Sequence, residues 1–127
     1  MTVSATMVLL LVLALQVKHL VADFYLQTAY MLSRRGRYLH PGRALHCLVH
    51  ILGTTLVLFV FGTPPGPLAA ILLAEFVIHF HIDWGKAQIV ARRSLTPEDA
   101  AYWHATGVDQ ALHHATYIGI AGIWAGL

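Results

Sequence analysis

Long apolar runs alternate with short polar or proline-rich segments along the whole chain. The runs cover residues 3–30, 43–61, 67–90 and 106–125. A helix needs roughly 20 mostly apolar residues to cross the hydrocarbon core of a bilayer. The pattern therefore predicts an all-α fold, in which one integral membrane domain (residues 1–127) forms a four-transmembrane-helix bundle. Acidic and aromatic residues between Thr96 and Trp103 also predict a short interfacial helix before the last span.

Composition supports a membrane protein. The chain is 57% hydrophobic and 11% charged, whereas soluble domains average about 25% charged residues. A net charge of +2 gives no reason to expect nucleic acid as a partner. The single cysteine, Cys47, excludes an internal disulfide and a multi-cysteine zinc site. The first run has no basic residue before it and no small-residue cleavage site after it, so we expect a retained span rather than a signal peptide.

The distribution of arginines predicts the orientation. Positively charged loops of membrane proteins stay on the cytoplasmic side. The first and third predicted loops carry all of the loop arginines, whereas the second, residues 62–67, has no charge. These arginines are Arg34, Arg35, Arg37, Arg43, Arg92 and Arg93. We therefore expect a plasma (inner) membrane protein with both termini on the non-cytoplasmic side.

Each predicted helix carries two potential metal ligands four positions apart, and residues at this spacing share one helix face. The pairs are His19 with Asp23, His46 with His50, His79 with Asp83, and Asp109 with His113. At about 1.5 Å per residue, they lie roughly 16 to 30 Å from the outer ends of their helices, in the cytoplasmic half. Such groups cost several kcal/mol inside a bilayer unless they are paired, hydrated or bound to metal. We therefore expect the four pairs to face one another.

Five imidazoles and three carboxylates exceed the needs of one tetrahedral zinc ion, which takes about four ligands. They suit two ions held about 3.5–4 Å apart by bridging carboxylates. A mixed set of histidine and carboxylate ligands fits Zn, Mn or Fe and does not choose among them. The predicted cofactor is therefore a pair of divalent transition-metal ions.

Other polar residues of the predicted helices receive separate roles. Glu75 and Lys86 lie on the stripe of His79 and Asp83, and we predict both to be catalytic. Glu75 would be a general base, with a metal ligand or a hydrogen-bond acceptor for a ligand as alternatives. Lys86 would bind an anionic group, with extension toward the headgroups as the alternative. Lys18 is expected to extend toward the headgroups. Three residues are expected off the site because they lie at other angles around their helices, namely Cys47, His81 and His114. Gln27 and Gln110 are potential hydrogen-bond partners of the ligands.

Four motifs in order also carry a resemblance that covers nearly the whole chain. They are the segment from Lys18 to Thr28, His46-x3-His50, the segment from His79 to Lys86, and Asp109-Gln110-x2-His113. These motifs resemble a family of small bacterial and phage membrane proteins catalogued as a domain of unknown function. The resemblance implies a multi-pass membrane protein and no settled reaction. More loosely, the pattern is similar to membrane-bound metal-dependent hydrolases, by analogy only.

The hypothesis that follows is a di-metal hydrolase acting at the cytoplasmic headgroup layer. Its substrate would be an anionic lipid or another phosphorylated or ester compound, drawn in by the arginine-rich loop. One alternative is a metal-ion or proton transporter, although the apolar outer halves of the helices offer no polar path. Another is a metal-stabilised membrane protein without catalysis. Haem ligation is disfavoured by the neighbouring carboxylates. Homo-oligomerisation stays open.

Overall fold

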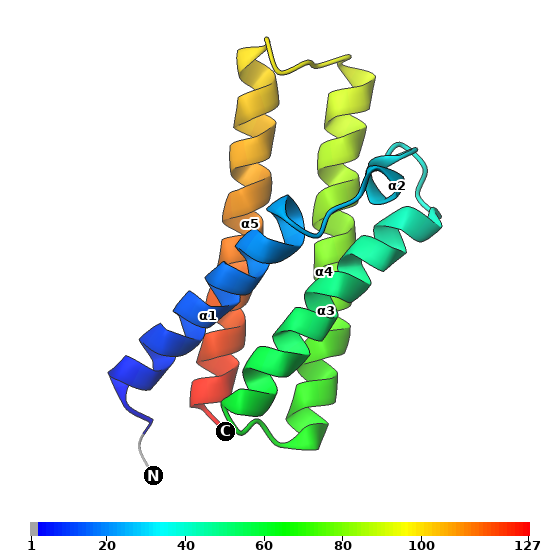
Figure 1. Ribbon diagram of the computed structural model, residues 1–127. Helices are drawn as coiled ribbons and strands as arrows, with labels where there is room; N and C mark the ends of the chain where they lie inside the picture. The colour runs from blue at the N-terminus through cyan, green and yellow to red at the C-terminus, as the bar shows by residue number, and fades with distance from the viewer. Residues whose placement is uncertain (1–2) are drawn as a thin grey trace.

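The computed structural model describes residues 3–127, and every regular element in that range is a helix. The helices are α1 (Ala5–Phe24), α2 (Ala29–Leu32), α3 (Pro41–Val60), α4 (Pro65–Arg92) and α5 (Ala100–Ala125) (Figure 1). The start of α1 and the end of α5 lie at the same end of the bundle (Figure 1). The all-α prediction is confirmed.

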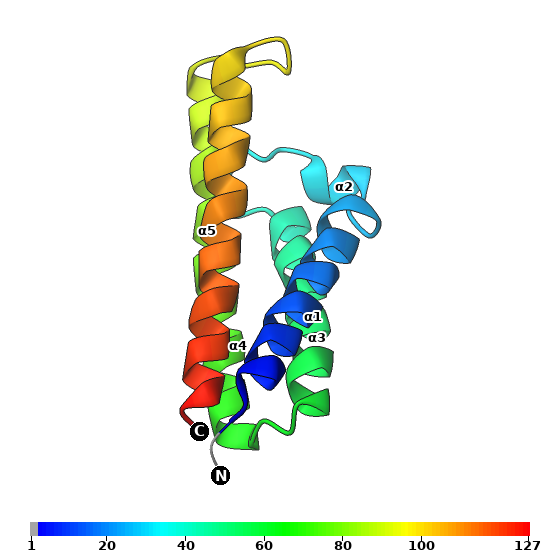
Figure 2. The same ribbon diagram turned by 90° about the vertical axis from the view of Figure 1, so that its left-hand side faces the viewer.

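The four long helices form a closed ring of neighbours. α1 packs on α3 and α5, and α4 packs on α3 and α5, while α2 lies against α3. α4 and α5 form one antiparallel pair, and α1 and α3 are inclined to it, so that the two pairs diverge toward α2 (Figure 2). Each long helix therefore turns one face toward the same interior, and this interior is where the polar pairs are carried.

Three of the described helices are long and apolar enough to cross a membrane: α1, α3 and α4. Large apolar side chains cover their outward faces, for example Leu9, Leu56 and Phe59, which are more than 60% exposed. Such side chains suit contact with lipid. α5 has 26 residues but is not among the three. The predicted membrane character is thus supported by three helices, and the fourth span remains a prediction.

The first helix is shorter than predicted. α1 ends at Phe24 rather than near residue 30, and the amides of Tyr25 and Leu26 both bond to the carbonyl of Val21 at 3.0 Å. The chain then turns, because Thr28 adopts an extended conformation and its hydroxyl accepts a hydrogen bond from the amide of Met31 at 3.4 Å. This cap begins α2. A threonine can cap a new helix as readily as continue an old one, and hydrophobicity alone did not distinguish the two.

The predicted interfacial helix is wrong as a separate element. α5 is continuous from Ala100, so it includes Tyr102 and Trp103 as well as the predicted last span. The residues before it form a turn, in which Asp99 accepts hydrogen bonds from the amide and hydroxyl of Thr96 at 2.8 and 3.2 Å. α3 and α4 begin two residues earlier than predicted, each with a proline at its first position, where the missing N–H is not needed.

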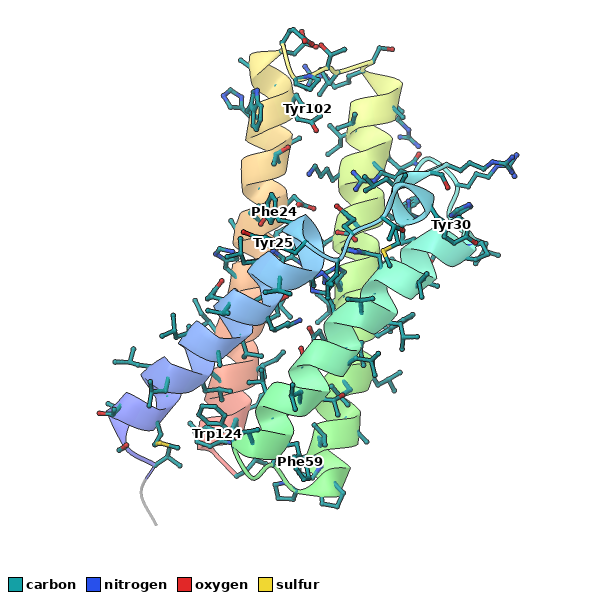
Figure 3. The ribbon with its side chains drawn as sticks, viewed as in Figure 1. Phe24, Tyr25, Tyr30, Phe59, Tyr102 and Trp124 are labelled. Atoms are coloured by element: carbon teal, nitrogen blue, oxygen red, sulfur yellow. The ribbon has the colours of Figure 1, made fainter. Side chains whose placement is uncertain are left out.

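An apolar cluster fills the half of the bundle nearest the two termini. Its members come from all four long helices and are 5% exposed or less: Leu11, Leu15, Leu58, Ile71, Tyr117, Ile120 and Ala121. Trp124 packs against this cluster, and Figure 3 shows Trp124 and Phe59 at this end and Tyr102 at the other. The cluster leaves only the opposite half of the interior for polar groups.

Candidate metal centre

Five buried imidazoles meet beside the apolar cluster. The ring centroids of His50 and His79 are 4.1 Å apart, and those of His79 and His113 are 4.2 Å apart. His46 lies 4.7 Å from His50, and His19 lies 5.2 Å from His113. All five are at most 4% exposed. The structure thus brings one or two histidines from each of the four long helices into a single cluster.

Asp23 joins the imidazoles of α1 and α3. Its Oδ1 lies 2.9 Å from Nε2 of His50 and 3.3 Å from Nε2 of His46. Its Oδ2 lies 3.1 Å from Nε2 of His19. Three imidazoles therefore direct the same ring nitrogen at one carboxylate, so the first polar pair contacts the second.

Asp83 plays the corresponding part for α3, α4 and α5. Its carboxylate oxygens lie 3.2 Å from Nε2 of His113, 3.4 Å from Nε2 of His79 and 3.5 Å from Nε2 of His46. Asp109 adds a carboxylate 3.7 Å from Nε2 of His113. Since His46 lies between Asp23 and Asp83, the two carboxylate groupings are continuous.

The geometry groups the ligands into two main sets, and a third set, Cys47 with His79 and Asp83, links them by sharing one residue with each. Within each set, one ligand atom from every residue lies within 4.8 Å of the others. The first set is Asp23, His46, His50 and His79, and the second is Asp83, Asp109 and His113. His19 contacts Asp23 but belongs to neither set. Seven of the eight predicted ligands are therefore placed where a metal ion could bind.

Several ligand atoms are buried without a hydrogen bond among the described residues. These include Nε2 of His79, Oδ1 of Asp109 and Nδ1 of His46. Leaving a polar atom buried and unpaired costs about 1–3 kcal/mol. His79 belongs to the first set and Asp109 to the second, so a metal ion bound in each set would satisfy one of these two atoms. The residues present therefore fit metal ligation. Cys47, expected off the site, also brings its sulfur within 4.8 Å of ligand atoms of His79 and Asp83.

Lys18 lies inside the bundle and not, as predicted, among the headgroups. Its side chain is only 8% exposed, and its Nζ donates to Oε1 of Glu75 at 2.7 Å. Thr54 donates to the same oxygen at 2.9 Å, and Nζ also donates to the hydroxyl oxygen of Tyr117 at 3.2 Å. Burying a lysine away from water costs free energy, and a lysine side chain therefore tends to extend outward. Here the attraction to the buried carboxylate of Glu75 offsets that cost. Glu75 and Lys18 therefore form a buried ion pair between the apolar cluster and the histidines.

This ion pair also constrains His50. Nζ of Lys18 lies 3.3 Å from Nδ1 of His50 and donates to the His50 carbonyl at 3.2 Å. An ammonium group has three donors and no acceptor, and four polar atoms surround this one; the contact with Nδ1 is a hydrogen bond only in the tautomer in which Nδ1 accepts. In that tautomer the proton of a neutral His50 ring is on Nε2, which donates to Asp23. Metal binding through Nε2 of His50 would require Lys18 to move, and this ligand assignment stays a prediction.

Further hydrogen bonds orient His19. Its Nδ1 lies 2.8 Å from the hydroxyl of Tyr117, and its Nε2 lies 3.0 Å from Oε1 of Gln110. Gln110 also donates to Asp109 at 3.1 Å. Gln110 thus has the predicted position beside the ligands. Partners of this kind fix the ring orientation of a ligating histidine.

Two histidines predicted to lie off the site do so. His81 is exposed, with Nδ1 2.7 Å from the Val77 carbonyl and Nε2 2.9 Å from the Tyr38 hydroxyl. His114 is exposed on α5. His40, in the first loop, caps α3 through a hydrogen bond from the amide of Gly42 at 3.1 Å, a role that the sequence did not suggest.

A polar cavity of about 380 Å³ leads to the cluster from the end away from the termini. Four of the predicted ligands line it, together with Lys86, whose Nζ lies 3.5 Å from Oδ2 of Asp109. The other lining residues belong to the end of α1, to α2 and its loop, and to the facing parts of α3, α4 and α5. We call this space the polar cavity. It gives the candidate metal centre access to one side of the bundle.

One buried arginine holds the arginine-rich loop through its backbone. Arg43 is only 5% exposed, and its guanidinium donates to the carbonyls of Arg37 at 3.0 Å, of Tyr38 at 3.3 Å, and of Arg35. Arg43 therefore holds the loop in place, although it also lines the polar cavity. Arg35 lines the same cavity and is exposed, so it is better placed to meet an anion.

Residues 8–125 match a family described as "Protein of unknown function (DUF3307)". The chain belongs to this family. No curated protein and no solved structure matches it. The match confirms the resemblance to an uncharacterised family, and all of the residues of both ligand sets fall inside it. What this DUF3307 chain does must therefore be argued from its own site.

Proposed function

We propose that this protein is a membrane-embedded di-metal hydrolase that cleaves a phosphorylated or ester substrate at the cytoplasmic headgroup layer. One observation carries the proposal: two linked ligand sets adjoin a polar cavity, and some of their buried ligand atoms make no hydrogen bond among the described residues. Two adjacent ions are the common solution for displacement at phosphorus and carbonyl centres. Zn, Mn and Fe all suit the donors.

The chain's own residues would supply orientation and charge. When bound, the ions would activate a water and stabilise negative charge on the attacked group. Lys86, with a side chain 19% exposed at the cavity, would hold an anionic substrate group. Glu75 accepts from Lys18 and Thr54 through Oε1, whereas its Oε2 accepts no hydrogen bond among the described residues. A role as general base would fall to this second oxygen.

Access from a single side supports hydrolysis over transport. The polar cavity is bounded by the ends of the helices away from the termini, and the apolar cluster fills the other half of the interior. An ion or proton pathway needs polar groups or water along its whole length. The apolar cluster offers neither, so the same geometry that suits a one-sided active site is unfavourable for a conduit.

The proposal includes a fourth span and an orientation. α5 packs along α1 and α4, and its 26 residues extend about 39 Å, enough to cross a bilayer. We place the polar cavity and the arginines on the cytoplasmic side and both termini on the other.

Cysteine labelling in intact cells tests this orientation. In a Cys47→Ser background, single cysteines replace Gly36, Glu98 and Gly66 in turn. An impermeant maleimide should label Gly66→Cys only; labelling of Gly36→Cys would refute the orientation.

Metal content and turnover test the function directly. We expect the purified chain to hold roughly two transition-metal ions and to hydrolyse a generic phosphodiester or carboxylic ester with added Mn or Zn. His79→Ala and Asp83→Ala should lower turnover by at least about a hundredfold, whereas the control His114→Ala, at an exposed histidine that lines neither cavity, should not. Variants that retain full metal and turnover would refute the site. Divalent-cation flux into liposomes without hydrolysis would favour transport.

A further inference from the structure

A second cavity, of about 720 Å³, runs between α4 and α5. We call it the apolar groove. Its walls are mostly aliphatic, and five of the large side chains that line it are 44–61% exposed: Val77, Ile78, Ile89, Val108 and Leu112. Its volume is in the range of about 300–1,000 Å³ typical of small-molecule sites. In a membrane, such a groove on the outer surface of two helices opens to lipid.

The polarity of the groove changes along its length. On α4 its lining begins at Val77 and Ile78, near the middle of the helix, and ends at Arg93, at the cytoplasmic end proposed above. Lys86 and Arg93 lie toward that end, together with His104 of α5. Asp109 is the one acidic lining residue, and it is paired with Lys86. One end of the groove is therefore apolar and the other is cationic.

The dimensions match one leaflet. From Val77 to Arg93 the groove follows α4 and its C-cap over 17 residues, and the rise between the first and the last is about 24 Å. Half of a bilayer, headgroups included, is roughly 20–22 Å thick. An anionic lipid of the cytoplasmic leaflet has the same polarity over the same length, with its chain toward the midplane and its negative headgroup outermost.

The groove is continuous with the candidate metal centre through two residues. Lys86 and Asp109 line both the apolar groove and the polar cavity. Asp109 is also a member of the second ligand set. A molecule with its chain in the groove would thus bring its headgroup to the boundary shared with the metal ligands.

We propose that the apolar groove binds the acyl chain of the substrate, and that the substrate is an anionic lipid whose headgroup phosphate meets Lys86. This inference rests on the proposed hydrolase function. It narrows the substrate class from phosphorylated or ester compounds in general to membrane lipids. Arg93 would contribute to the preference for a negative headgroup.

Gly85 permits a sharp test, because it lines the groove and a Cβ atom added there meets no atom within 4 Å. Gly85→Phe should fill the groove without disturbing the protein. The matched control is Gly119→Phe on α5, which also has open space around it and does not line the groove. Binding of dioleoyl phosphatidylglycerol to delipidated, chelator-treated protein is measured by native mass spectrometry. Without metal the probe is not consumed, so the result does not depend on turnover.

We expect Gly85→Phe to weaken phosphatidylglycerol binding by at least about tenfold and Gly119→Phe to leave it unchanged. Arg93→Gln should reduce the preference over dioleoyl phosphatidylcholine. Wild-type affinity in Gly85→Phe overturns the proposal, as does equally tight binding of glycerol phosphate, which would indicate a soluble substrate. If Gly85→Phe loses its helical circular dichroism, Val108→Phe on the opposite wall replaces it with the same expectation. Binding as expected without hydrolysis in the metal-loaded protein would refute the proposed function alone.

Discussion

Replacing Lys18 by methionine should destabilise the bundle more than any other single lysine change. Lys18 is the cation of the buried pair with Glu75, and its ammonium also donates to His50 and Tyr117. Lys18→Met leaves a carboxylate that is 1% exposed with Thr54 as its remaining donor. Removing one partner of a buried ion pair costs about 3–5 kcal/mol, whereas replacing both partners is often close to neutral.

The magnitude can be measured by a double-mutant cycle. The free energies of unfolding of Lys18→Met, Glu75→Gln and the double variant are compared by titration from mild detergent into SDS, with helical circular dichroism as the signal. We expect the double variant to be more stable than the sum of the single changes predicts, by about 0.5–3 kcal/mol. Lys86→Met is the matched control, because that lysine lies 3.5 Å from its aspartate and is more exposed. Additive losses would refute the pairing.

Three further predictions concern the packing of α2 on α3, the role of Asp23 and the effect of metal removal. Gly42→Ala should lower the free energy of unfolding by about 1–3 kcal/mol, because the added methyl would lie 2.5 Å from the carbonyl oxygen of Tyr30. The control Gly66→Ala, with open space around it, should leave the unfolding midpoint unchanged. Equal midpoints for the two variants would contradict the close approach of α2 and α3. Asp23→Asn should lower metal content measured by plasma mass spectrometry, since three imidazoles converge on that carboxylate, whereas unaltered stoichiometry would remove Asp23 from the ligands. Chelation should lower the thermal midpoint, because an ion at about 100 times its Kd adds about 2.7 kcal/mol; an unchanged midpoint in metal-loaded protein would argue against bound metal.

The residues at i and i+4 made the cluster predictable, because helical periodicity and the cost of burying polar groups both require a common interior face. His79 with Asp83 and Asp109 with His113 illustrate this: each pair contacts the other, as their spacing suggested. The same periodicity could not place Lys18. Its position off the stripe of His19 fits either the headgroups or a neighbouring helix, and only the three-dimensional position of Glu75 decides between them.

Breaks in helices were harder to predict than the clustering of the polar side chains. The apolar and polar pattern continues past Phe24, yet the chain turns there, because Thr28 caps a new helix. Near residue 100 the opposite happened: Tyr102 and Trp103 resemble an interfacial segment, but no residue after them interrupts α5. Hydropathy measures the preference of a side chain for lipid or water, whereas the local hydrogen bonds of a few side chains determine where the backbone bends.

The two ligand sets differ in the order in which the ribosome can complete them. The first set draws on α1, α3 and α4, so its last member emerges with His79. The second set lies entirely within the α4–α5 hairpin and waits for Asp109 and His113. Because membrane helices are inserted from the N-terminus onward during synthesis, the first set is whole in the nascent chain while the second still has one of its three residues. We therefore expect the final hairpin to close both the helical ring and the second ligand set late in synthesis.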